Sequence, residues 1–310
     1  MNSFRTAQLN KFSSGIGAAI QCSLKSFAQI YCQSSAWFGA GLLLALSMSG
    51  ATLAVAGCAG MAIANGCALA LRARRADLAD GVYGYNAALC SVGLAATYQA
   101  DTGLLLWIAA AGLACAMATH AFLRWGRLPA LTLPFVAIML LAAWLAPLTG
   151  LHLLANGGKA YYSLPVFAFH AWAQICFIDS PALGMLLLAA LAWQRWHSAI
   201  AALCAALLAW GLAAAGAGIW PMDVHPHLTG IALNCMLSAV CLTANRRSRP
   251  VCLLGMAVTA GLGLVCAVLD LHLFTLPFVA ASWVILQATK ADGQLPAAQS
   301  RRSPQRSPTT

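Results

Sequence analysis

Two pairs of neutral polar residues stand out in a chain that is otherwise strongly apolar. Gln29 and Gln174 lie in similar segments, FAQIYCQSSAWFGAGLLLAL (27–46) and WAQICFIDSPALGMLLLAAL (172–191). Thr132 and Thr275 each begin the tetrapeptide TLPF. Amide and hydroxyl groups both donate and accept hydrogen bonds without ionising. These four residues are therefore the first candidates for binding a polar solute.

A third recurring feature shows that the chain contains an internal repeat. The segment GVYGYNAALCSVGLA (81–95) resembles GIALNCMLSAVCL (230–242), which aligns Asn86 with Asn234. The two glutamines are 145 residues apart, the two asparagines 148 and the two threonines 143. Three features in the same order at nearly the same separation indicate two related halves, a pattern that decides the fold when it is present.

Composition places these halves in a membrane. The chain has 310 residues, of which 61% are hydrophobic and 8% charged, and its mean hydropathy is +0.79. A soluble domain carries about 25% charged residues. A membrane-spanning helix needs about 20 apolar residues, and residues 12–290 have room for about ten such helices. The 26 glycines suit close helix packing. The prediction is an all-α membrane protein.

The charge distribution predicts how the two halves are oriented. The net charge of +10 is concentrated in short clusters between apolar runs, so membrane topology explains it better than nucleic-acid binding. Arginines at 72–75 have no basic counterpart near 217–223, and arginines at 246–249 have none near 98–101. Under the positive-inside rule the halves are inverted, which requires an odd number of spans in each. The alternative is that the arginines flank helices at random.

The resulting organisation is a 5+5 inverted repeat with both termini cytoplasmic. The basic loops at 72–75, 124–127, around 195 and at 246–249 are expected on the cytoplasmic side. The predicted segments are a cytoplasmic tail (1–12), the first transmembrane repeat (13–150), an external linker (151–163), the second repeat (164–290) and a disordered basic tail (291–310).

No motif for catalysis, metal binding or ion coupling is recognisable. The nucleophile elbow, the Walker motif and HExxH are absent, so no enzyme is expected. No acidic residue lies in the middle of an expected span, which favours passive permeation over coupled transport. The twelve cysteines form no CxxC pair. His225 and His227 are the only closely spaced histidines, and neither a metal site nor a cofactor is predicted.

The repeated segments resemble the urea transporter family. The similarity covers about residues 15–290, and its most specific elements are GVYGYNAAL and LPALTLPF. The resemblance implies ten transmembrane helices plus two half-membrane helices in an inverted repeat. It also implies a homotrimer in the inner membrane, surrounded by lipid, with one pore in each protomer. Transport would be passive, with urea moving down its gradient.

Urea sets clear demands on such a pore. It is small, flat and neutral, and removing its water without replacing the hydrogen bonds costs several kcal/mol. A selective pore needs acceptors along the edge of the molecule and apolar walls over its faces. By resemblance, Gln29 and Gln174 bind the NH2 groups at the wide ends, and the hydroxyls of Thr132 and Thr275 meet at the narrow centre. The alternatives are a glutamine that bonds between helices and a threonine that bonds to its own helix.

The remaining candidates form the walls and hold the broken backbone. The wall residues are Ile30, Cys32, Tyr85, Leu89, Ile175, Phe177, Leu233 and Leu237. Family members usually have aromatic residues at the positions of Cys32 and Leu233, so another small neutral amide, ammonia or water is the alternative solute. The structural residues are Asn86, Asn234, Pro129, Pro134 and Pro277, because proline frees a carbonyl where it interrupts a helix. A membrane enzyme or scaffold that kept only the fold is the third hypothesis.

Overall fold

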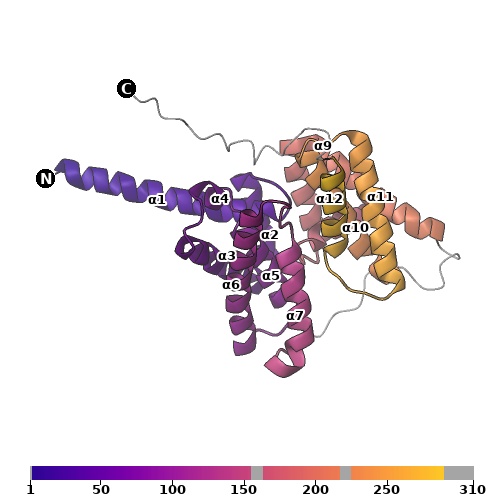
Figure 1. Cartoon of the computed structure of the whole chain (residues 1–310), viewed down its shortest axis with the longest axis horizontal. Coiled ribbons are helices and arrows are strands. Elements are labelled where there is room, and N and C mark those ends of the chain that lie inside the picture. Colours follow the sequence, from indigo (N-terminus) through magenta and orange to yellow (C-terminus); the bar gives the residue numbers. More distant parts are fainter. Residues whose placement is uncertain (1, 155–162, 217–224, 290–310) are drawn as a thin grey trace.

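The computed structural model describes residues 2–154, 163–216 and 225–289, which form twelve helices and no β-strand. The first half contains α1 (Asn2–Gln29), α2 (Ala36–Ser49), α3 (Ala51–Ala70), α4 (Arg75–Ala79), α5 (Gly84–Thr97), α6 (Thr102–Trp125) and α7 (Leu133–Thr149). The second half contains α8 (Leu164–Gln174), α9 (Pro181–Gly216), α10 (His225–Ala244), α11 (Arg249–Val268) and α12 (Leu276–Ala288). Figure 1 shows the two groups of helices side by side.

The outer surface of the helix bundle is apolar, as expected of a protein embedded in lipid. Five helices of the described chain are long and apolar enough to cross a membrane. In four of these helices only 33–39% of the apolar stretch is buried inside the protein. In α10 the buried share of that stretch is 67%. Large apolar side chains such as Trp37, Leu148 and Trp193 are exposed. The chain is therefore an all-helical membrane protein with α10 near its centre.

Helix α9 consists of two helices that meet at Arg195. The backbone of this residue has φ −150° and ψ 71°, which is not helical. The two parts of α9 occupy the positions of α2 and α3 in the first half, where Gly50 separates two helices. With α9 divided in this way, each half has six helices in the same order, and the five-residue α4 is additional.

The two halves share details of backbone packing as well as helix order. Gly39 on α2 lies so close to α1 that an added Cβ would be 1.7 Å from the carbonyl oxygen of Leu24. Gly184 on α9 approaches α8 in the same way, with 1.9 Å to the carbonyl oxygen of Phe169. Both residues of the second contact lie 145 positions after those of the first, which is the separation of the two glutamines. The repeat is thus visible in the geometry of the structure.

In the first half, the basic segments lie together at one end of the bundle. The end of α5 is joined to the end of α7, because Gln99 donates its N–H to the carbonyl of His152 (2.8 Å) and Leu154 donates to Thr97 (2.9 Å). The start of α5 and the end of α6 must then lie at the opposite end. Residues 72–75 precede α5 and residues 124–127 span the end of α6, so both clusters share that opposite end (Figure 1).

The basic segments of the second half lie at the same end. The hydroxyls of Ser198 and Thr243 are 3.0 Å apart, which places Arg195 near the 246–249 cluster. Helix α12 runs towards this end, and the indole N–H of Trp283 donates to the carbonyl of Pro129 (2.9 Å). We call this the basic end of the bundle, and the end that contains residues 97–101, 150–154 and 268–272 the linker end.

Some predicted segment boundaries differ from the described helices or lie outside them. Helix α1 begins at Asn2, so residues 2–12, which were expected to form a tail, are helical. Most of the predicted external linker and all of the predicted C-terminal tail lie outside the described residues.

Candidate functional site

Thr132 and Thr275 meet where the two halves join. Each is the residue immediately before a helix, α7 or α12, and their hydroxyl oxygens are 2.7 Å apart. Both side chains are buried, with 3% and 4% exposure. The two threonines come from equivalent positions of the repeated segments, so the contact joins matching points of the two halves.

The prolines of the TLPF motifs act differently from the expectation that they interrupt a helix. Pro134 and Pro277 lie in the first turns of α7 and α12, where a missing N–H removes no intrahelical hydrogen bond. The chain enters these helices through left-handed residues, Leu131 (φ 45°) and Phe274 (φ 50°). The motif therefore starts a helix, and the carbonyls next to each threonine are left outside it. Pro129 lies in the exposed segment before α7.

Two asparagines hold these exposed carbonyls in place. Asn86 on α5 donates its side-chain amide to the carbonyl of Leu131, and Asn234 on α10 donates to that of Phe274, both at 2.9 Å. Asn234 also donates to Gly230 (2.8 Å) and accepts the N–H of Phe278 (3.0 Å). The asparagines thus fix the backbone on both sides of the threonine pair.

Tyr85 and Leu233 make the two halves unequal at this point. The hydroxyl of Tyr85 donates a hydrogen bond to the carbonyl of Leu131, which therefore accepts two donors. Leu233 occupies the equivalent position on α10 and has no group that could donate to the carbonyl of Phe274. One lone pair of that carbonyl therefore remains available beside Thr275.

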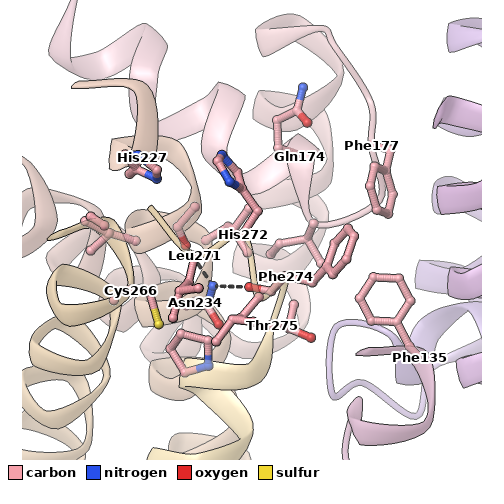
Figure 2. Close-up of a pocket in the computed structure, with 18 residues that line it drawn as sticks. Phe135, Gln174, Phe177, His227, Asn234, Cys266, Leu271, His272, Phe274 and Thr275 are labelled. Carbon is pink, nitrogen blue, oxygen red and sulfur yellow. Dashed lines mark hydrogen bonds between the residues drawn. The ribbon is translucent and has the colours of Figure 1, made fainter. Parts of the chain in front are cut away.

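A cavity of about 260 Å³ leads to Thr275 from the linker end (Figure 2). Its lining includes several predicted residues of the second half: Gln174, Ile175, Phe177, Leu233, Asn234, Thr275 and Pro277. The cavity is not lined by Leu237, nor by the predicted binding and wall residues of the first half, which are Gln29, Ile30, Cys32, Tyr85, Leu89 and Thr132. The cavity therefore brings together predicted residues of the second half and reaches Thr275 but not Thr132.

Aromatic rings narrow the cavity in front of the threonines. Phe135 packs edge-on against Phe274, with ring centroids 5.6 Å apart, and against Phe177 at 6.2 Å (Figure 2). Such rings provide the flat apolar surface that a planar solute requires. Phe135 and Phe274 were not predicted as wall residues, although both belong to the repeated segment around TLPF.

The two glutamines differ in their partners. Gln29 is partly buried near the basic end, and its side-chain amide donates to the carbonyl of Asp80 (3.1 Å). Gln174 lines the cavity, and its amide nitrogen lies 3.2 Å from Nε2 of His170, which is 2.8 Å from the carboxylate of Asp179. The two glutamines therefore contact different local groups, a backbone carbonyl for Gln29 and an imidazole for Gln174.

Two predicted wall residues, Phe177 and Cys32, each face a residue of the other half, and the facing residue is smaller where the wall residue is larger. The ring of Phe177 lies against Gly93, where an added Cβ would be 2.9 Å from the ring. At the equivalent place in the other half, the thiol of Cys32 lies close to that of Cys241. Gly93 and Cys241 are separated by 148 residues, as are Asn86 and Asn234. A large residue thus faces a small one, and two small residues face each other.

The fold defines a helical membrane protein, and neutral groups that can form hydrogen bonds lie at the junction of its two halves. A model of the Urea transporter family matches residues 20–290, which include both glutamines and both threonines. The chain therefore belongs to the urea transporter family, whose members are transporters and not enzymes, and this membership indicates facilitated transport of urea. A search of curated proteins gives no match.

Proposed function

We propose that each protomer conducts urea passively along the path that joins Gln174, the threonine pair and Gln29. The observation that carries this proposal is the hydroxyl pair at 2.7 Å, flanked by two backbone carbonyls that asparagines hold in place. A urea molecule that parts the two hydroxyls exchanges their mutual hydrogen bond for bonds to its own NH2 groups. This exchange offsets the several kcal/mol that desolvation of urea would otherwise cost.

The absence of charge along the path supports a passive mechanism. The titratable residues that line the cavity are His227, His272 and Cys266, and the two histidines lie towards its mouth. No carboxylate lines it. Coupled carriers usually place an ionisable group at the centre of the membrane. A path that offers only neutral acceptors at its narrowest point can select a neutral solute without binding an ion.

We also propose that the six helices of each half form five spans and one half-membrane helix. Helix α8 has 11 residues, and at 1.5 Å per residue it covers only about half of a membrane core of roughly 30 Å. Helix α8 and the C-terminal part of α1 are the proposed half-membrane helices. The basic end would face the cytoplasm by the positive-inside rule, with both termini on that side of the inner membrane. Assembly as a homotrimer in lipid is proposed from the family alone.

Urea flux into vesicles tests the proposal. Purified protein is reconstituted into liposomes, and urea uptake is followed by light scattering after rapid mixing. We expect faster uptake than in protein-free vesicles, with a dependence on the urea gradient and none on a proton or sodium gradient. Uptake no faster than in protein-free vesicles would refute the proposal.

A second candidate solute is a slightly larger neutral amide. Leu233 replaces the aromatic residue expected beside Thr275 and leaves a carbonyl of the cavity with a single donor. Acetamide, which replaces one NH2 group of urea by a methyl group, suits a wall that is less polar and less tightly filled. A ranking of the permeabilities of urea, acetamide, ammonia and water in the same vesicles distinguishes the two proposals.

A further inference from the structure

We propose that His227, Asp270 and His272 form a binding site for a divalent transition metal of the zinc class at the mouth of the cavity. The ligand atoms of the three side chains all lie within 4.8 Å of one another. Nε2 of His227 is 3.4 Å from the carboxylate of Asp270, and the two imidazole rings have centroids 5.0 Å apart. Figure 2 shows the two histidines above the cavity.

The backbone after α11 brings the three side chains together. Asp270 adopts a left-handed conformation (φ 51°), and the chain reverses through hydrogen bonds from its N–H to Ala267 (3.0 Å) and from that of Leu271 to Cys266 (2.8 Å). This turn directs Asp270 and His272 towards His227 in the first turn of α10. His227 lies more than forty residues before Asp270 and His272, so the spacing of the ligands gives no recognisable metal motif.

The donor set suits zinc better than a hard cation. Two imidazoles and one carboxylate are a common zinc set, and three protein ligands leave the fourth tetrahedral position open. With metal–ligand distances of about 2.0–2.2 Å, tetrahedral ligand atoms lie roughly 3.3 Å apart. The pair at 3.4 Å already has this separation, and the others must approach by about 1.5 Å or less. The side chain of Asp270 is 78% exposed and is free to move by that amount.

The site occurs in one half only and does not follow from the fold. The residues that align with His227, Asp270 and His272 in the first half are Ala79, Arg127 and Pro129. None of these is a usual metal ligand. The linker end contains a second His–Asp contact, between His152 and Asp101 at 3.4 Å, but within the described residues it has no third ligand. The trio is thus distinct from an ordinary surface ion pair.

A metal ion at this position would obstruct the path. His227 and His272 both line the cavity that ends at Thr275, so an ion between them lies over its mouth. It would also tie the start of α10 to the loop before α12 and fix the width of the opening. Zinc binding itself is independent of transport, whereas its effect on flux rests on the proposed urea path. We therefore infer that zinc inhibits urea flux from the linker end.

Zinc binding is measured first, by calorimetric titration of the full-length protein in detergent with zinc chloride. We expect one site per chain. His227→Gln, His272→Gln and Asp270→Asn should each weaken binding by more than about tenfold, since even outer-shell partners of metal ligands contribute 10- to 100-fold. Asparagine tolerates the left-handed backbone at 270, so this variant keeps the turn. His152→Gln is the matched control and should bind zinc as the unchanged protein does.

Zinc inhibition of urea flux is measured next, as the ratio of rates with and without zinc for each protein. We expect zinc on both sides of the vesicles to inhibit the unchanged protein and His152→Gln, and EDTA to reverse the effect. The three site variants should lose most of the inhibition. Equal zinc affinity in the site variants and the unchanged protein would overturn the metal site. Zinc binding without inhibition would overturn its position over the path. Absence of zinc-free flux would instead refute the proposed function.

Discussion

Replacing both threonines of the central pair by valine should slow urea permeation strongly. Valine keeps the shape of Thr132 and Thr275 but removes both hydroxyls, which lie 2.7 Å apart. In the proposed mechanism, urea exchanges the hydroxyl–hydroxyl bond of the unchanged protein for bonds to itself, so the cost is small. In the double variant an N–H group of urea would cross this point without an acceptor, which costs about 1–3 kcal/mol. At 1.36 kcal/mol for each factor of ten, the rate falls by about 5- to 160-fold.

The structure provides a matched control for this experiment. The hydroxyls of Ser238 and Thr259 are also 2.7 Å apart and buried, but neither residue lines the cavity. Ser238→Ala with Thr259→Val removes a comparable hydrogen bond from the interface between α10 and α11. This control variant should lose some thermal stability and keep its urea flux. A second control, Thr132→Ser with Thr275→Ser, keeps both hydroxyls and should retain most of the flux.

The assay is urea uptake by proteoliposomes, normalised to the amount of folded protein recovered from the vesicles. Normalisation separates slower permeation from a loss of reconstituted protein. A double-valine rate within about twofold of the unchanged rate, which corresponds to only about 0.4 kcal/mol, would show that the hydroxyls do not serve the solute. Equal losses in the double-valine and control variants would assign the effect to helix packing. Either result would refute the central step of the proposed mechanism.

Three further changes follow from the geometry. Leu233→Tyr should supply a second donor to the carbonyl that Asn234 already binds, and should reduce acetamide permeability more than urea permeability in the same vesicles. Gly39→Ala should destabilise the protein by about 1–3 kcal/mol or more, because the added Cβ would overlap a backbone carbonyl of α1. Gly41→Ala is the control: its added Cβ would have no atom within 4 Å, so the thermal unfolding temperature should not change. Asn234→Leu should be more destabilising in thermal unfolding than Asn86→Leu by about 2 kcal/mol, because it loses three hydrogen bonds and not one.

The sequence was sufficient to predict the features that the two halves share. The separations of the paired glutamines and threonines predicted an internal repeat, and the contacts of Gly39 and Gly184 reproduce it in the backbone. These features are predictable because they depend on short local segments. A polar residue duplicated in two similar segments occupies equivalent positions whenever the segments fold alike. The family assignment from the same segments is confirmed by the match over residues 20–290.

Features that depend on contacts between distant segments could not be predicted. The sequence could not show that Phe274 and Phe135 would approach to 5.6 Å, because their contact crosses the junction of the halves. Nor could it show that Asp270 and His272 would turn back towards His227. The partners of the two glutamines were equally hidden, since the residue that aligns with His170 in the first half is Lys25, and Gln29 donates instead to the backbone carbonyl of Asp80. Some tertiary contacts, such as those of Gly39 and Gly184, are repeated with the duplication, but contacts between residues that differ in the two halves are not.

The two halves differ at their wall positions, and the residues that face these positions determine what each difference does. Cys32 is small where its counterpart Phe177 is large, but the facing residues change in the opposite sense, from Gly93 to Cys241. This difference is therefore compensated across the junction and need not widen the path. The replacement of an aromatic residue by Leu233 has no such compensation, and the cavity lies on that side of Thr275. At the linker end the cavity is therefore lined by the apolar Leu233, whereas in the first half Tyr85 donates a hydrogen bond to the carbonyl of Leu131. It follows that Leu233 should govern which solutes enter, and the threonine pair how fast they cross.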